Sequence, residues 1–163
     1  MYKRQRALGV KIAAPPAGAV PQEHAANVVL WQTHDLGMEP HDWPQPDGAP
    51  ADNASWSSPS RMVASLGFHY SMANGWWPKN GVRYRKPRKW LPKGAEKLRL
   101  EQLVVAMGTE LLGEPPSKRM VSACCQAVGY GPRTQITKEH PIVKWNMGRL
   151  VTTFLDSPDH MTR

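Results

Sequence analysis

The sequence predicts a mostly α protein, with a small three-helix C-terminal domain and a long Pro-rich, largely irregular N-terminal extension. Apolar residues recur at helical spacing in three stretches after residue 95, whereas most of the sixteen Pro lie before it. Seven Trp argue against simple disorder, because disordered chains are usually poor in aromatic residues. We therefore expect the extension to become ordered by lying on a partner.

Composition divides the chain into four parts: a basic arm, residues 1–22; an acidic, Pro-rich extended region with one short helix, residues 23–75; a basic-aromatic segment, residues 76–94; and the helical domain, residues 95–163. Residues 1–22 carry four basic groups and no acid, residues 23–58 carry six acids and no Lys or Arg, and residues 79–99 carry nine basic groups against one acid. A clustered basic stripe is the electrostatic pattern expected of a nucleic-acid binder.

The N-terminal half offers one clear helix. Residues 23–37 place Ala25, Val28, Val29 and Gln32 at helical spacing, and Gly37 is a plausible C-terminal stop. Five prolines between residues 38 and 60 exclude regular structure there. Residues 61–71 are apolar and fit a short helix or a strand.

The C-terminal third is amphipathic throughout. The first helix is predicted over residues 95–112, ended by Gly113, and the second over residues 118–128, capped by Ser117 and ended by Gly129. The third begins at Pro141 and ends before Ser157. Their apolar sets are Leu100, Leu103, Val104, Met107, Leu111 and Leu112, then Met120, Val121, Cys124, Cys125 and Val128, then Val143, Met147, Leu150, Val151, Phe154 and Leu155. A core of about sixty residues is marginal on its own.

The basic-aromatic segment contains Asn80-Gly81, a strong signal for a two-residue turn. If a strand follows, Val82 and Tyr84 point to one side and the arginines between and after them to the other. Pro78 limits the preceding arm to an edge position, so a lone basic hairpin or a plain turn is expected.

This segment supplies the candidate site. Lys and Arg neutralise phosphates, while Trp rings stack on unpaired bases, and an irregular, Pro-interrupted segment suits folded RNA better than a DNA duplex. The predicted nucleic-acid contacts are Lys79, Arg83, Arg85, Lys86, Arg88, Lys89, Lys93, Trp76, Trp77 and Trp90, with Lys3, Arg4 and Arg6 from the arm. Two other interpretations stay open: the Trp rings pack on the helical domain while the cations are solvated, or the acidic region lies against the basic segment.

Catalytic and metal-binding patterns were not found. The histidines lack zinc-ligand spacing, no G-x-S-x-G motif occurs, and the adjacent Cys124 and Cys125 lie on an apolar helix face. No enzyme activity and no cofactor are predicted. Residues 95–128 have the spacing of a helix-turn-helix, but the second helix is too apolar to bind a DNA groove.

These features are typical of a non-catalytic structural subunit of a large assembly. We expect an RNA-binding protein of a ribosome-like, for instance mitochondrial, particle that contacts structured RNA and neighbouring protein subunits. The alternatives are an accessory subunit of a multi-protein or membrane-bound organellar complex, and a DNA-contacting viral structural protein. Two cysteines and no transmembrane segment favour a reducing intracellular compartment such as the mitochondrial matrix, and residues 1–20 fit a targeting segment as well as a basic arm.

Overall fold

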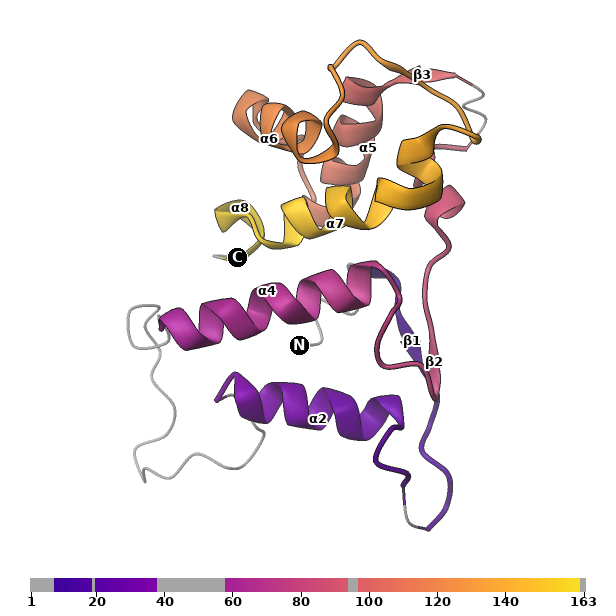
Figure 1. Cartoon of the computed structure of the whole chain (residues 1–163), viewed down its shortest axis with the longest axis vertical. Helices are drawn as coiled ribbons and strands as arrows, with labels where there is room; N and C mark the ends of the chain where they lie inside the picture. The colour runs from indigo at the N-terminus through magenta and orange to yellow at the C-terminus, as the bar shows by residue number, and fades with distance from the viewer. Residues whose placement is uncertain (1–7, 19, 38–57, 94–96, 162–163) are drawn as a thin grey trace.

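The computed structural model describes residues 8–18, 20–37, 58–93 and 97–161. Helices make up 57% of these residues, so the prediction of a mostly α protein is confirmed. Figure 1 shows α2 (Ala25–Asp35), α4 (Pro59–Ala73) and α7 (Met147–Leu155) stacked in successive layers, with α5 (Leu100–Leu112) and α6 (Lys118–Val128) beyond α7. The short α8 (Pro158–Met161) follows α7. Because α7 contacts α4, α5 and α6, it is the central helix of the fold.

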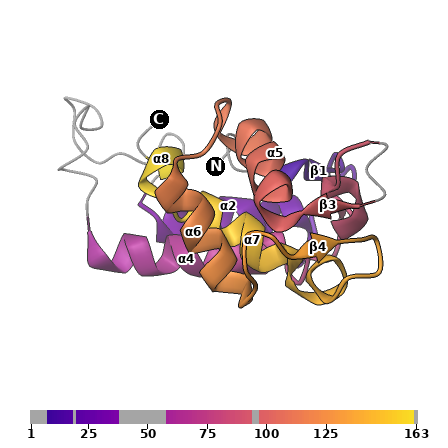
Figure 2. The ribbon, with the colours of Figure 1, turned by 90° about the horizontal axis from the view of Figure 1, so that it is seen from above.

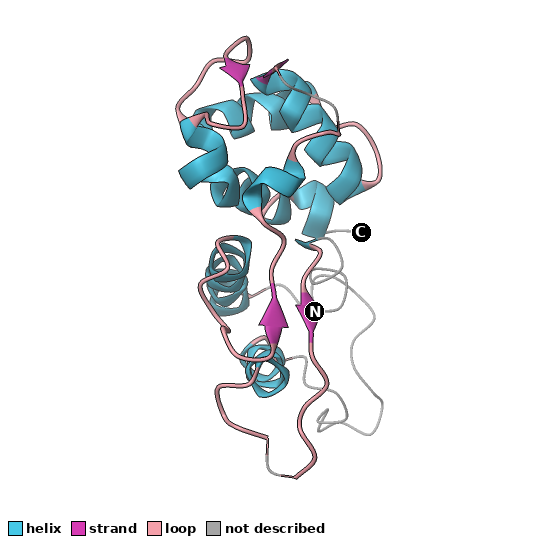
Figure 3. Cartoon of the chain, turned by 90° about the vertical axis from the view of Figure 1, so that its right-hand side faces the viewer, coloured by secondary structure: helices cyan, strands magenta, loops and turns pink. Residues whose placement is uncertain are grey.

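Two small antiparallel sheets tie distant segments together. The strand β1 (Lys11–Ile12) pairs with β2 (Val82–Arg83), and β3 (Leu98–Arg99) pairs with β4 (Gln135–Ile136). Figure 3 shows β1 and β2 side by side along the flank of the two N-terminal helices. The first sheet therefore joins the start of the chain to the basic-aromatic segment.

The helices of the C-terminal third were predicted well. Residues 118–128 form α6, Ser117 accepts a hydrogen bond from the backbone N–H of Met120, and Gly113 and Gly129 end their helices with left-handed backbones. The first helix begins at Leu100 rather than near residue 95, because residues 98–99 pair with β4. The third predicted helix is formed by a π-helical segment, η2 (Ile142–Asn146), and by α7, which follows it directly.

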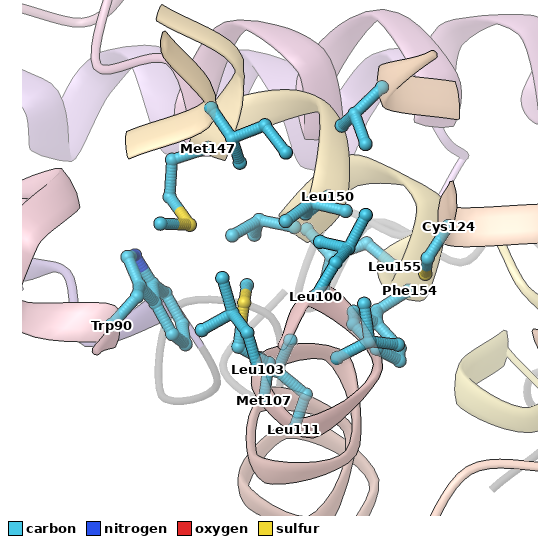
Figure 4. Packing of buried hydrophobic residues seen from close by; sticks show 14 of the residues in the cluster. Trp90, Leu100, Leu103, Met107, Leu111, Cys124, Met147, Leu150, Phe154 and Leu155 are labelled. Atoms are coloured by element: carbon cyan, nitrogen blue, oxygen red, sulfur yellow. The ribbon is translucent and has the colours of Figure 1, made fainter. Parts of the chain in front are cut away.

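The predicted apolar sets form the core. All their members are buried except Val121, which packs against the cluster. Figure 4 shows Leu103 and Met107 of α5 facing Met147 and Leu150, with Trp90 pointing inward beside them. Figure 2, from above, shows α5 and α6 covering α7.

The prediction of a separate, irregular N-terminal extension is wrong for the described residues. Residues 25–35 form the predicted short helix, and residues 59–73 form a second, α4, in which the helical alternative prevails. Leu8 and Met72 belong to the same buried cluster as the C-terminal helices. The Pro-rich residues 38–57 lie outside the described residues. The local sequence pattern did not predict the packing of Leu8 and Met72 on the C-terminal helices, because these contacts join elements that lie far apart in the sequence.

Two contacts hold α4 against α7. The His69 side chain, which is buried, lies 2.6 Å from the carboxylate of Asp156, the residue that caps the end of α7. At the other end, a Cβ atom on Gly148 would overlap the side chain of Asn74, so the two helices approach closely there. These contacts join the N-terminal helical layer to the C-terminal core.

The Asn80-Gly81 turn forms, but residues 76–79 do not pair with β2. Gly81 has a positive φ of 67°, and a Cβ atom at this position would overlap the ring of His24. Asn80 bridges to His24, and β2 takes β1 as its partner. The glycine is therefore required by both its backbone conformation and the approach of α2. Over the described residues, no helix has the length and apolar character needed to cross a bilayer.

Candidate nucleic-acid interface

A hollow of about 440 Å³ lies where β1 meets the basic-aromatic segment. We call it the basic hollow; its lining has no acidic side chain and consists of Gly9, Lys11, Arg83, Tyr84, Arg85, Lys86 and Lys89. Lys11 and Arg83 are directly opposite each other in the β1–β2 register. Like charges at such positions repel, so a bound anion would relieve a repulsion that the fold itself creates.

A second hollow of about 430 Å³ adjoins the first. We call it the aromatic hollow; it is lined by Ala73, Asn74, Gly75, Trp76, Tyr84, Arg85, Lys86, Pro87, Lys144, Trp145, Met147 and Gly148. The two hollows share Tyr84, Arg85 and Lys86, so they form one continuous surface. No acid lines the second hollow either.

Two tryptophans in the aromatic hollow are unusually exposed. Trp76 follows the end of α4 and is 54% exposed, and Trp145 in η2 is 78% exposed. In η2 the side chains of Ile142 and Val143 are buried, which leaves Trp145 on the opposite, solvent side. π-helical turns within helices occur frequently at functional sites.

Arg85 is held in place by several groups. Its guanidinium binds the carboxylate of Glu110 and donates to the backbone carbonyl of Lys89, at 2.6 Å from Nη2. The same group lies over the Trp90 ring, with Cζ 3.8 Å from the centroid. Trp90 itself is only 6% exposed and belongs to the core, so its ring is not offered to an external base.

Glu139 connects two cations at the edge of the surface. It accepts from Arg88 at 2.6 Å and from Lys144 at 2.8 Å. The hydrogen bond from Lys144, together with the charges of Lys144 and Arg88, lowers the pKa of the Glu139 carboxyl. Glu139 therefore stays negative well into the acidic range and partly neutralises Lys144.

Tyr84 lines both hollows. Its hydroxyl donates to the Pro78 carbonyl at 2.7 Å, and burial raises the pKa of Tyr84 to about 12. The side chain therefore stays neutral at physiological pH and adds no negative charge to the surface. As predicted, Val82 and Tyr84 are partly buried and Arg83 is exposed, but Arg85 folds back onto Trp90.

The structure brings only some of the sequence-predicted contacts together. Arg83, Arg85, Lys86 and Lys89 line the basic hollow, and Trp76 lines the aromatic one. Lys79, Lys93 and Trp77 are exposed but line neither hollow, Arg88 is paired with Glu139, and Trp90 is buried. Lys3, Arg4 and Arg6 lie outside the described residues. Of the acidic region, Glu23 contacts the basic-aromatic segment by accepting from the Asn80 amide at 3.1 Å.

Two cations and one tryptophan that line the surface were not among the predicted contacts: Lys11, Lys144 and Trp145. Trp145 could have been predicted as a contact from the sequence. It lies outside the apolar face predicted for residues 142–156, and an aromatic residue on the polar face of a helix indicates a binding site. Lys11 could not have been predicted from the sequence, because only the pairing of β1 with β2 brings it to the surface.

The cysteines take no part in this surface. Cys124 and Cys125 are free and buried, and burial, reinforced for Cys124 by its neighbour, raises the pKa of both thiols, that of Cys124 to about 12. Both are therefore protonated at neutral pH. Across the described ranges, no three His, Cys, Asp or Glu side chains are grouped so as to hold a metal ion.

Comparison with known proteins gives a family but no relative of established function. No curated protein matches the chain, and no solved structure matches it. One family, described as "Protein of unknown function (DUF1800)", matches residues 3–162, which leaves out only the first two residues and the last. The chain therefore belongs to the DUF1800 family.

Proposed function

We propose that this protein is a non-catalytic RNA-binding protein, and that the basic hollow holds the phosphate chain. The observation that carries the proposal is the cluster of Lys11, Arg83, Lys86 and Lys89 around one hollow whose lining has no acid. Among the described residues, none of the four is in an ion pair. They are free to neutralise phosphates and release counterions.

The continuity with the aromatic hollow favours nucleic acid over a small anion. A lone phosphate or a carboxylate would use the cations and leave the adjoining tryptophans exposed. A nucleic-acid chain offers phosphates and apolar base faces in alternation, which fits a basic hollow beside an aromatic one. A ribosome-like particle as the source of that RNA stays a prediction, and the proposal requires only RNA with accessible backbone and bases.

The helical half offers a different kind of surface. A hollow of about 580 Å³ between α5 and α6 is lined mainly by apolar and uncharged groups, among them the exposed Val105. This observation favours the second candidate function, an accessory subunit that docks on a neighbouring protein. The two functions differ in salt dependence, because phosphate contacts weaken steeply with salt and apolar docking does not.

Filter binding to a structured RNA, from about 50 to about 400 mM salt, tests the proposal. The test variant changes Lys11, Arg83, Lys86 and Lys89 together to Gln. The matched control changes Lys118, Arg119, Arg133 and Lys138 to Gln. These four residues are exposed and line neither the basic nor the aromatic hollow, and their substitution removes the same total charge as the test variant.

Wild type and control should bind with a steep salt dependence. The test variant should lose the binding, or at least about three units of the slope of log K against log salt, as four single-strand phosphate contacts predict. Equal binding by all three proteins would contradict the proposal. Equal losses in both variants would show a non-specific effect of net charge.

A further inference from the structure

We propose that the aromatic hollow is a nucleobase pocket, so that the RNA partner presents an unpaired base there. This inference rests on the proposed function and adds the ligand class of the second hollow. Its basis is the convergence of two exposed indoles, from Trp76 and Trp145, on one hollow that is continuous with the phosphate-binding one.

The two rings come from separate parts of the fold. Trp76 follows α4, and Trp145 lies 69 positions further along the chain, in η2. Trp76 is oriented by Tyr70, whose ring it meets edge to face with centroids 5.1 Å apart and planes at 89°. Such an arrangement fixes a ring at low entropic cost while leaving it more than half exposed. Both indoles gain by covering their apolar faces, and a flat aromatic ligand covers them best.

The size of the hollow fits a small ligand. At about 430 Å³ it lies within the range of roughly 300–1,000 Å³ found for small-molecule sites. Its lining includes Gly75 and Gly148. Gly75 has a positive φ of 65° and lies against the Tyr84 ring, and Gly148 lies against Asn74, so a larger residue at either position would disturb a wall of the hollow.

The charges indicate a base attached to phosphates. Lys86 lines both hollows, and Lys144 lines the aromatic one. A nucleotide whose base lies between the indoles would have its phosphates within reach of these cations and of the basic hollow. A duplex keeps its bases stacked inside, so only a single-stranded region or a loop can bind in this way.

The test uses Trp145→Leu, with Trp31→Leu as the matched control. Trp31 lies on α2, is 46% exposed and lines neither hollow. The probes are a twelve-nucleotide oligouridylate, the same strand paired with its complement, the same backbone with abasic sites, and inorganic polyphosphate. Affinity is measured by fluorescence anisotropy, and tryptophan quenching reports stacking. Circular dichroism melting verifies that each variant is folded.

Wild type and Trp31→Leu should bind the single strand more tightly than the duplex or the abasic strand, with quenching. Trp145→Leu should lose about 5- to 150-fold in affinity for the single strand, the range for one stacked base, and most of the quenching. Its affinity for polyphosphate should be unchanged. Trp76→Leu should behave in the same way.

Two outcomes would overturn the inference alone. If Trp145→Leu and Trp76→Leu bind the single strand as wild type does, no base occupies the hollow, while loss of binding in the four-cation variant would leave the proposed function standing. If Trp145→Leu and Trp76→Leu lose as much affinity for polyphosphate as for the single strand, the two rings shape the phosphate site and do not bind a base. Binding by wild type to neither RNA nor polyphosphate would overturn the proposed function and this inference together.

Discussion

The guanidinium of Arg85 lies over the indole of Trp90, with Cζ 3.8 Å from the ring centroid. Sequence alone makes both residues candidates for binding RNA. The structure shows that they bind each other, with Glu110 as a third partner. One cation and one aromatic residue of the basic-aromatic segment therefore hold that segment on α5 and the core.

Arg85→Gln should lower the free energy of unfolding by about 1–3 kcal/mol, because it removes a cation–π contact and charge-assisted hydrogen bonds together. The neighbouring Lys86→Gln removes the same charge from an exposed position and should change stability by less than about 0.5 kcal/mol. Urea unfolding at neutral pH measures both. Equal stabilities of the two variants would contradict a structural role for Arg85.

Gly148→Ala should destabilise the protein by about 1 kcal/mol, because the added methyl group would overlap the Asn74 side-chain amide and displace it from its hydrogen bond to the Tyr70 carbonyl. Gly67 offers a control in the exposed face of α4, where a Cβ atom meets nothing within 4 Å. Gly67→Ala should stabilise by about 0.5–1 kcal/mol through helix propensity. Thermal melts of the two variants should therefore move in opposite directions, and a stabilised Gly148→Ala would disprove the close approach.

Stability should fall as the pH rises above 9. The pKa of the Cys124 thiol is raised by burial from 9.0 to about 12, so above pH 9 the unfolded chain loses a proton that the folded one keeps. The free energy of unfolding then decreases with pH, by at most about 1.4 kcal/mol per pH unit for each such group. Below pH 9 both states are protonated and this contribution is constant.

Urea unfolding at intervals from about pH 7 to about pH 11 measures this slope. Cys124→Ala should lower stability at every pH but flatten the slope between pH 9 and 10. Tyr84, whose pKa rises from 10.0 to about 12, should add its own decrease above pH 10. A slope that is the same in wild type and Cys124→Ala would show that this thiol is not the group responsible.

Glu139→Gln should raise RNA affinity about two- to fivefold at low salt, since it frees Arg88 and Lys144 from a surface ion pair. The gain should disappear as salt increases, because screening weakens the added attraction. Asp159→Asn, which removes an exposed acid in α8 away from both hollows, is the control and should have a smaller effect. Anisotropy titrations at two salt concentrations distinguish these results.

Sequence reasoning succeeded where structure depends on local pattern. The spacing of Leu100, Leu103 and Met107 identified a core helix, and Ser117 and Gly129 marked helix ends, because these signals act within a few residues. It left α4 open between a helix and a strand, because the local pattern of its apolar residues fits both and the packing of α4 on α7 decides between them.

The candidate surface depends on longer-range contacts. Its cations on residues 83–89 were visible as a charge run, but the run gave no sign that Arg85 and Trp90 face inward. Lys11 joins them through a strand pairing, and Trp145 joins Trp76 through the crossing of α4 and α7. Pairings between distant segments leave little trace in a single sequence, so the basic segment was found and its geometry was not.

The pairing of β1 with β2 also bears on how the protein folds. Lys11 meets Arg83 across a long loop of chain, and Leu8 packs in a cluster that reaches Leu155. Closing such loops costs entropy before the contacts can compensate, so folding should be slower than for a bundle of sequential helices. During synthesis β1 must wait for β2, and Leu8 must wait for the helices of the core, which are made later still. Until then the edge of β1 stays unpaired and Leu8 stays exposed, so a chaperone that shields apolar segments would act on this part of the chain.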